Sequence, residues 1–362
     1  MTPAKKSQLD ATDWGSDSGT PPAAISMDDV LAARDVIRPF LEPTPLLRNP
    51  VLSNRLGAEA FVKLENVQTI GAFKIRGAIN LLANMDKKQR KKGIVTATRG
   101  NYGAALAQAC AMFDARCTVF VPEGNSPDKN TTVEALGGEV IIQGHDFDAA
   151  WDASVRHAWK IGAVSIHPAK RAELVAGQAT VALEMLEQSD GGLDVVFVPV
   201  GGGSLAAGTT TVIKSMSPAT AVIAVQAENA PAFHHAWHTD NYAPMVAAKT
   251  IADGLATRVP VRYTLGMMKE LDDFVLVSED EVCAAIRCYA QTIHQLAEGG
   301  GAASLAAALK MKDQLAGKRV GLILTGGNID SASLAVAMRI DAPMHTPHAV
   351  PQFPLASLDY GD

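Results

Sequence analysis

The segment DVVFVPVGGGSLAAG, residues 194–208, contains a short apolar run, three glycines and the start of an alanine-rich run. An apolar run without alternation is typical of a strand that is covered on both faces. Glycine lets the backbone turn sharply and approach a ligand closely. The segment therefore predicts one β-α unit of a parallel α/β fold, with a binding site at the turn.

The same alternation of short apolar runs and longer alanine-rich runs continues through most of the chain. We predict strands at residues 60–65, 93–98, 117–122, 139–144, 194–200, 221–227 and 319–327. Helices are predicted at residues 102–113, 126–137, 146–162, 174–188, 279–295 and 301–317. Repeated β-α units indicate parallel sheets with helices on both faces, and in such folds ligands bind at the carboxyl ends of the strands.

The composition is that of an ordinary soluble protein and argues against several classes of partner. Of the 362 residues, 48% are hydrophobic and 19% are charged, and the net charge of −6 gives no basic footprint for nucleic acid. No apolar run is long enough to cross a membrane and no secretory signal is evident, so we expect a cytoplasmic protein. The four cysteines form no CxxC pair and are expected to be buried thiols.

The two ends of the chain differ from its body. Residues 1–25 are polar and lack periodicity, which predicts a disordered arm. The proline-rich residues 341–362 are predicted to form a tail, with an ordered strap over the surface as the alternative. The length of the remaining body favours two domains.

Two of the predicted strands run into turns that suit anions. Residues 93–98 are followed by the turn 100–103 and a helix, whose first backbone N–H groups could bind an anion, although a plain tight turn is the alternative. Residues 201–204 are Gly-Gly-Gly-Ser and could wrap around a phosphate. This turn matches neither the GxxxxGK[ST] loop nor a complete GxGxxG fingerprint.

A hydroxyl group and a lysine complete the set of candidate groups. The strand at 319–327 ends in Thr325-Gly326-Gly327, which either places a hydroxyl against a ligand or forms a routine turn. In GAFKIRGAIN, residues 71–80, Lys74 is either a surface lysine or a nucleophile whose pKa is lowered by an enclosed site. A lysine able to form a Schiff base, together with a phosphate turn, suits pyridoxal 5′-phosphate.

Six ordered motifs resemble those of the fold-type II pyridoxal-phosphate enzymes, and among these the threonine/serine dehydratase and serine racemase family. They are ENVQTIGAFKIRGAIN, TRGNYG, PVGGGSLAAG, TIADGLA, AEGGGAASLAA and LTGGNID. The resemblance implies a two-domain α/β fold like that of the tryptophan synthase β subunit, with parallel-rich sheets flanked by helices. It implies a large cofactor-binding domain at 26–92 and 168–340 and a small domain at 93–167, with the cofactor between them.

The resemblance also implies roles for single residues. Lys74 would form the Schiff base with pyridoxal 5′-phosphate, and Phe73 would pack near the cofactor. Thr325 would face the pyridine nitrogen, and a neutral hydroxyl there suits β-elimination. The remaining cofactor-binding groups would be Asn101, at the ring hydroxyl, and the phosphate-binding backbone of Gly201, Gly202, Gly203, Ser204 and Leu205. The substrate carboxylate would bind at Thr98, Arg99, Gly100, Asn101 and Tyr102.

Several positions depart from the family pattern. Ala72 replaces a serine, which removes one active-site hydroxyl. Arg99 replaces the serine that acts as a base in racemases, and since a guanidinium stays protonated, racemase activity is disfavoured. Arg99 could instead pair with a second substrate carboxylate, as in 3-hydroxyaspartate, or point outward into solvent. Tyr102 replaces a histidine and could narrow the pocket or offer a stacking face.

The family's divalent-cation site maps onto Glu228, Ala232 and His234, where histidine replaces an aspartate. Hard cations prefer oxygen ligands, so we predict no required metal. His234 and His238 lie on one helical face and could bind a transition metal or be ordinary surface residues.

These features predict a carbon–oxygen lyase that converts an L-3-hydroxy amino acid to a 2-oxo acid and ammonia by β-elimination, with Lys74 as the catalytic base. Threonine and serine are the default small amino-acid substrates, while 3-hydroxyaspartate and phenylserine stay open. A β-replacement or isomerase reaction on the same fold, or a cofactor-binding protein without turnover, are the competing interpretations. The family suggests a homodimer or a dimer of dimers.

Overall fold

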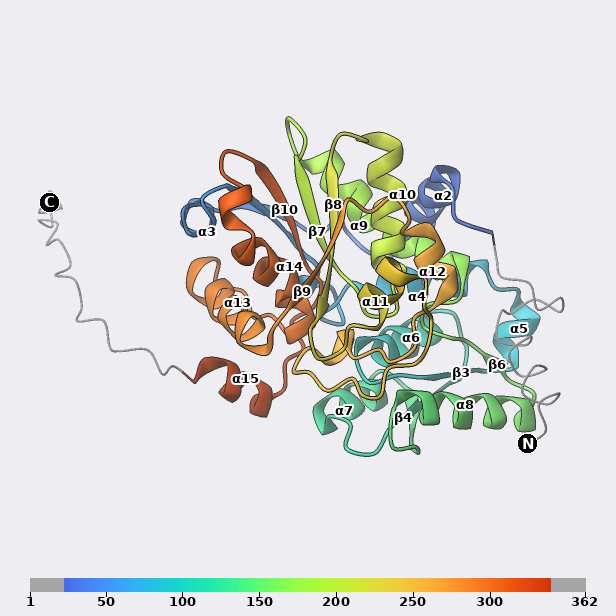
Figure 1. Ribbon diagram of the computed structural model, residues 1–362. Helices are drawn as coiled ribbons and strands as arrows, with labels where there is room; N and C mark the ends of the chain where they lie inside the picture. The colour runs from blue at the N-terminus through green and yellow to red at the C-terminus, as the bar shows by residue number, and fades with distance from the viewer. Residues whose placement is uncertain (1–22, 340–362) are drawn as a thin grey trace, which may run out of the picture.

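The computed structural model describes residues 23–339, which form an α/β fold with two sheets (Figure 1). The larger sheet has the order β1-β2-β10-β7-β8-β9, and all neighbouring strands in it are parallel except β1 and β2. Its strands are β1 (Leu46–Arg48), β2 (Glu59–Leu64), β7 (Val195–Pro199), β8 (Ala221–Ala227), β9 (Asp273–Val277) and β10 (Arg319–Leu324).

The smaller sheet has four parallel strands in the order β5-β4-β3-β6. They are β3 (Ile94–Ala97), β4 (Cys117–Val121), β5 (Gly138–Ile142) and β6 (Val164–Ser165). All four lie within residues 93–167, the range that we assigned to a small domain. The predicted fold class of parallel-rich sheets is confirmed, and the division into two domains stays a prediction.

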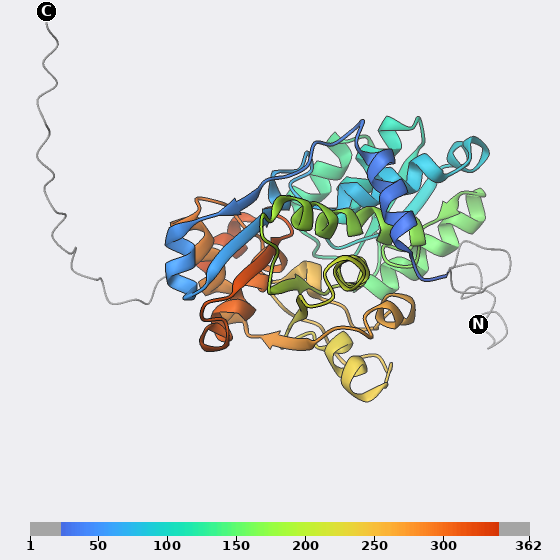
Figure 2. The ribbon, with the colours of Figure 1, turned by 90° about the horizontal axis from the view of Figure 1, so that it is seen from above.

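Helices cover both faces of the larger sheet, as the view from above shows (Figure 2). One face carries α2 (Met27–Ile37), α9 (Ala172–Gln188), α10 (Ser204–Met216), α11 (Ala232–Thr239) and α12 (Arg262–Met267). The other carries α3 (Pro50–Leu56), α13 (Glu279–Thr292), α14 (Gly299–Lys310) and α15 (Ser331–Met338). The buried apolar strands therefore have the two-sided cover that their sequence predicts.

The smaller sheet is also flanked on both faces. On one face lie α4 (Lys74–Asn84), α6 (Asn101–Met112) and α7 (Pro127–Ala135), and on the other lies α8 (Phe147–Ile161). The short helix α5 (Lys87–Lys91) and three 3-10 turns, η1 (Glu65–Val67), η2 (Asp253–Leu255) and η3 (Lys312–Gln314), complete the described elements. Helix α4 contacts α6, which covers the smaller sheet, and α9, which covers the larger sheet. It therefore lies where the helices of the two sheets meet.

All seven predicted strands and all six predicted helices are present; β8 has the predicted bounds, and the other elements have shifted ends. The helix predicted at 301–317 ends at Lys310, and its last residues form η3 instead. Sequence reasoning missed β1, β6 and β9, because runs of two to five residues beside charged or polar neighbours carry little periodicity. The four cysteines are free thiols, and Cys110, Cys117 and Cys288 are buried.

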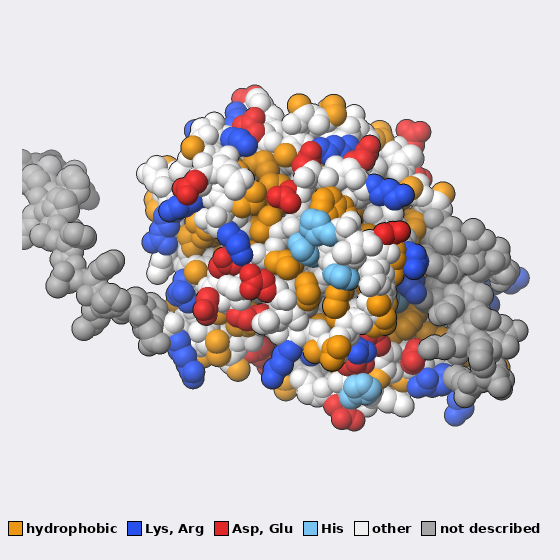
Figure 3. All heavy atoms as spheres, in the orientation of Figure 1, with side chains coloured by type: hydrophobic (Ala, Val, Ile, Leu, Met, Phe, Trp, Pro, Cys, Tyr) orange, Lys and Arg blue, Asp and Glu red, His pale blue; other side chains and the backbone are white. Residues whose placement is uncertain are grey.

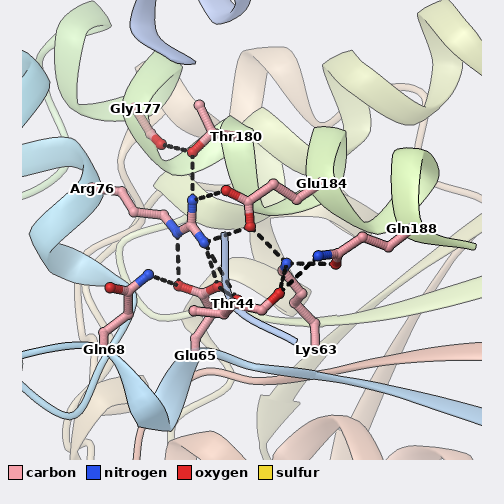
Figure 4. A network of polar contacts seen from close by, with 9 residues as sticks. All are labelled: Thr44, Lys63, Glu65, Gln68, Arg76, Gly177, Thr180, Glu184 and Gln188. Atoms are coloured by element: carbon pink, nitrogen blue, oxygen red, sulfur yellow. Dashed lines mark hydrogen bonds and ion pairs between the residues drawn. The ribbon is translucent and has the colours of Figure 1, made fainter. Parts of the chain in front are cut away.

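A buried network of charged groups fixes the position of α4 (Figure 4). The Arg76 guanidinium donates to both oxygens of Glu65, at 2.8 Å each, and to both oxygens of Glu184, at 2.6 and 2.8 Å. Lys63 Nζ lies 2.6 Å from Glu184 and 2.6 Å from the Thr44 carbonyl oxygen. Because these groups come from β2, η1, α4 and α9, the network ties the helix that begins at Lys74 to the larger sheet.

The ends of the chain are described only in part. Residues 1–22 of the predicted arm, and the predicted tail, lie outside the described residues. Residues 23–25, which we also assigned to the arm, lie against the body instead: Ile25 is buried, and the Ala23 carbonyl accepts a hydrogen bond from the Tyr263 hydroxyl.

Between residues 23 and 339, no helix has both the length and the apolar character needed to span a bilayer. On the face drawn in Figure 3, acidic and basic side chains are interspersed and form no continuous basic stripe.

Candidate active site

One cavity of about 700 Å³ brings the predicted turns together. It opens at the carboxyl ends of β3, β7 and β10, where a parallel α/β fold places its ligands. Every residue that we predicted for cofactor or substrate binding lines it: Phe73, Lys74, Thr98, Arg99, Gly100, Asn101, Tyr102, Gly201, Gly202, Gly203, Ser204, Leu205 and Thr325. The structure thus assembles turns that are far apart in the sequence, and the roles of the single residues stay predictions.

Lys74 is the first residue of α4 and is held beside the end of β10. The backbone N–H of Phe73 donates to the Thr325 carbonyl oxygen at 3.0 Å, and Ala72 forms a bridge with Gly326. The Lys74 Nζ lies 4.7 Å from the centre of the Phe73 ring. Burial lowers the pKa of Lys74 to about 8, although the nearby Glu298 opposes this shift. The amine is therefore close to its titration point near neutral pH.

The glycine turn has no space for side chains. Gly203 has φ +82°, and a Cβ there would lie 2.6 Å from Thr264 Oγ1. A Cβ at Gly201 would lie 2.1 Å from the Gly254 carbonyl oxygen. Thr264 Oγ1 donates to the Gly202 carbonyl oxygen at 2.8 Å, and this hydrogen bond fixes the backbone of the turn. Backbone N–H groups at the start of α10 therefore meet the cavity at close range, as an anion-binding turn requires.

Ser204 contributes an unused polar atom to the same turn. Its hydroxyl oxygen is buried and has no hydrogen-bond partner in the described part of the chain. A buried polar atom without a partner costs about 1–3 kcal/mol, and this hydroxyl lines the cavity with its hydrogen-bonding capacity unused. The partner-free hydroxyl, the glycine cradle and the amine of low pKa together fit a phosphate-bearing aldehyde, and pyridoxal 5′-phosphate is such a group.

The second turn is held by Thr98. Its Oγ1 accepts from the Gly100 N–H at 3.0 Å, and α6 begins at the next residue. The Asn101 side chain donates to Glu298 Oε1 at 2.6 Å and accepts from Asn328 Nδ2 at 2.8 Å, so its orientation is fixed. Tyr102 is 3% exposed and packs in the apolar cluster of α4 and α6, which leaves its ring little surface for stacking on a ligand.

Three charged residues of the site were not assigned roles from the sequence. Glu298 precedes α14 and is buried, and burial raises its pKa to about 7, although Lys129 opposes this shift. Lys129 Nζ, from α7, lies 2.5 Å from Asp253 Oδ2 and 3.5 Å from Glu298 Oε2. Asp253 lies in the motif TIADGLA and Glu298 in AEGGGAASLAA, so their positions in the sequence could have drawn attention to them. No local sequence pattern, however, predicts that either carboxylate pairs with Lys129.

His167 also lines the cavity and was missed. It follows β6 and lies edge-on to the Trp151 ring, with 4.9 Å between the ring centres. Burial lowers its pKa well below the usual range, and the charges of Lys170 and Lys74 add to the shift. The imidazole is therefore neutral in this site at neutral pH.

The mapped cation site contains a lysine. Lys310 Nζ lies 3.4 Å from Glu228 Oε1 and also donates to Glu281 and to the Leu276 carbonyl oxygen. His234 and His238 are in mutual contact, with 3.1 Å between their Nε2 atoms. Residues 23–339 contain no group of three or more side chains suited to hold a metal ion. The requirement for a metal stays a prediction.

Comparisons with known proteins agree with this geometry. The family model described as "Pyridoxal-phosphate dependent enzyme" matches residues 37–326. An L-threonine ammonia-lyase of Thermotoga maritima is 37% identical over 84% of this chain and 76% of its own length. An L-threo-3-hydroxyaspartate ammonia-lyase of Saccharomyces cerevisiae is 32% identical over 83% of this chain and 93% of its own length.

A solved structure shows the same fold. Maize serine racemase superposes with a TM-score of 0.82 at 30% identity, over 87% of this chain and 97% of the racemase. The similarity therefore extends over both sheets.

Proposed function

The chain belongs to the family of pyridoxal-phosphate dependent enzymes, and we propose that it converts an L-3-hydroxy amino acid to a 2-oxo acid and ammonia. The observation that carries the proposal is that Lys74, the glycine turn and the N-terminus of α6 line one and the same cavity. Relatives named as threonine and hydroxyaspartate ammonia-lyases support the reaction class. The family membership confirms the predicted cofactor and the resemblance on which it rested.

Each part of the cavity has a task in this reaction. When bound, pyridoxal phosphate withdraws electrons from the amino acid and acidifies its Cα–H bond. The turn 201–205 would hold the phosphate, and Lys74 would hold the cofactor until a substrate amine displaces it. The free Lys74 amine, with a pKa of about 8, is then suited to take the Cα proton at Nζ. The N–H groups at the start of α6 would orient the substrate carboxylate.

Arg99 argues for elimination rather than racemization. Racemization needs a second acid–base group on the face of the substrate opposite to Lys74. The side chain at position 99 lines the cavity, and its guanidinium stays protonated, so it cannot accept a proton from Cα. One basic group beside the substrate is sufficient for β-elimination.

The test is to measure 2-oxo acid release from L- and D-serine, threonine, 3-hydroxyaspartate and phenylserine. We expect release from at least one L-3-hydroxy amino acid, and a visible cofactor band that Lys74→Ala alters. Failure to bind the added cofactor would contradict the proposal. A cofactor band without oxo-acid release would instead favour replacement chemistry, and formation of a new amino acid on addition of an external nucleophile would establish it.

A further inference from the structure

Arg99 differs from the other arginines that line the cavity. The Arg258 guanidinium lies 2.7 and 2.9 Å from two aspartate carboxylates at the start of α8. Arg262 stacks on the Tyr242 ring at 3.8 Å. Arg99 is half-buried and makes no hydrogen bond, ion pair or ring contact with any residue from 23 to 339. Its charge is therefore available to an anion inside the cavity.

The acidic groups of the cavity do not neutralise Arg99. Asp253 is paired with Lys129, and Glu298 is held by Asn101 and lies near the same lysine. Asp148 is paired with Arg258, and Asp152, the remaining acidic residue of the lining, makes no ion pair with Arg99. An unpaired guanidinium in a partly enclosed site therefore faces ligand rather than protein.

A separate element beside Arg99 can bind the carboxylate that all amino acids share. The N–H of Gly100 donates to Thr98 Oγ1, but Gly100 has no side chain to cap α6. The first N–H groups of a helix have no acceptor within the helix, and the helix dipole favours negative charge there. The backbone of α6 thus suffices for the α-carboxylate, and the guanidinium of Arg99 forms a second anion-binding group next to it.

We propose that Arg99 selects substrates with a second carboxylate, the dicarboxylic 3-hydroxy amino acids of which 3-hydroxyaspartate is the simplest. The inference rests on the proposed function and narrows its substrate class. A guanidinium binds a carboxylate through two parallel hydrogen bonds, a geometry that lysine cannot reproduce. A threonine methyl group at the same place would leave the charge of Arg99 unpaired.

The test compares the binding of L-aspartate and L-alanine to the cofactor-loaded protein, followed by the change in cofactor absorbance. The two amino acids differ by one carboxylate, and neither carries a hydroxyl that could be eliminated. We expect L-aspartate to bind on the order of 10- to 100-fold more tightly, as a charged hydrogen-bonded pair allows. Arg99→Gln should remove this preference, and Arg99→Lys should keep only part of it.

Arg262→Gln is the matched control, because it removes an arginine from the same cavity and should leave the preference for L-aspartate in place. If Arg99→Gln weakens the binding of L-aspartate and of L-alanine equally, Arg99 binds the α-carboxylate, and the proposal is overturned. A preference that survives Arg99→Gln, or no preference in the natural protein, would also overturn it.

The binding test is independent of turnover. If no hydroxy amino acid releases an oxo acid, the proposed reaction fails, but a preference for L-aspartate that depends on Arg99 still establishes the dicarboxylate site. If oxo acid is released, the ratio of kcat/KM for 3-hydroxyaspartate to that for threonine should fall in Arg99→Gln by the same order, about 10- to 100-fold.

Discussion

Lys74 and Arg76 stand two residues apart on α4, and their surroundings are opposite. Arg76 is 1% exposed and gives its donors to two carboxylates (Figure 4). Lys74 faces the cavity, and within the described chain its amine has a ring contact with Phe73 but no hydrogen bond or ion pair. One helix thus carries one cation that is fully paired and one that is left without a partner.

The pairing decides what each charge does. Burial opposes the charge of Arg76, but Glu65 and Glu184 outweigh it and raise the pKa of the guanidinium. At Lys74 burial outweighs the attraction of Glu298, so the pKa falls to about 8. A paired buried charge has one protonation state and holds elements together, whereas an unpaired one can exchange protons with a substrate. The comparison therefore separates a structural cation from a reactive one on the same helix.

The largest effect is expected on activity, from Lys74→Met. Removal of the base and of the cofactor attachment should lower kcat by about 10³-fold or more. The folded apoprotein should be as stable as the natural protein or more so, because the change removes a charge that burial disfavours. Steady-state kinetics and urea unfolding of the same preparation measure both quantities.

If the Lys74→Met protein unfolds at a much lower urea concentration than the natural protein, Lys74 has a structural role. It would then not differ from Arg76 in the way proposed. The cofactor added to this variant should bind reversibly and be removed by gel filtration. Retention of a covalent cofactor would place the attachment on another lysine.

The next effect is on stability, from Arg76→Met. Glu184 would then keep its ion pair with Lys63, whereas buried Glu65 would lose its ion-pair partner, and removing one partner of a buried pair costs about 3–5 kcal/mol. Urea unfolding of the apoprotein measures the loss. Arg34→Met is the matched control, since Arg34 pairs with Glu187 at 3.4 Å on the surface and should cost about 1 kcal/mol or less. Similar losses in both variants would mean that the buried network is no stronger than a surface pair.

The sequence predicts the repeated β-α units and the turns of the site because both are local patterns. The glycine turn at 201–203 and the strand that precedes it are visible within one short segment. Pairing between distant residues is not local. Arg76 meets Glu184 across 108 positions, and Asn101 meets Glu298 across 197. A single sequence gives no sign of which charge finds which partner, so both charge clusters were missed.

The same limit applies to edge elements and to side-chain direction. Strand β6 has two residues, and its position beside β3 depends on the fold rather than on its own sequence. Sequence reasoning left two directions open for Arg99, and the structure places it on the wall of the cavity. The residues of the binding turns could be identified from the sequence, but the side chains that contact these turns, such as Glu298 beside Asn101, could not.

The smallest expected effect is on the pH dependence of stability, and it concerns two buried glutamates whose pKa values are shifted in opposite directions. The pKa of Glu298 is raised by burial from 4.5 to about 7, so the folded protein binds its proton more tightly than the unfolded chain. Its contribution to stability is therefore present at acidic pH and is lost as pH rises through this window. At Glu65, Arg76 outweighs burial and lowers the pKa, so that carboxylate stabilises at neutral pH and loses its contribution as pH falls.

Replacing each glutamate by glutamine should therefore change the pH dependence of stability in opposite directions. Relative to the natural apoprotein, Glu298→Gln should gain on the order of 2–3 kcal/mol between about pH 5 and pH 7.5. Glu65→Gln should be destabilised at neutral pH, and by less in acid. Urea unfolding at several pH values measures both. If the gap between Glu298→Gln and the natural protein is constant with pH, Glu298 does not titrate in this window, and its neighbours Lys129 and Asn101 hold it ionised as firmly as Arg76 holds Glu65.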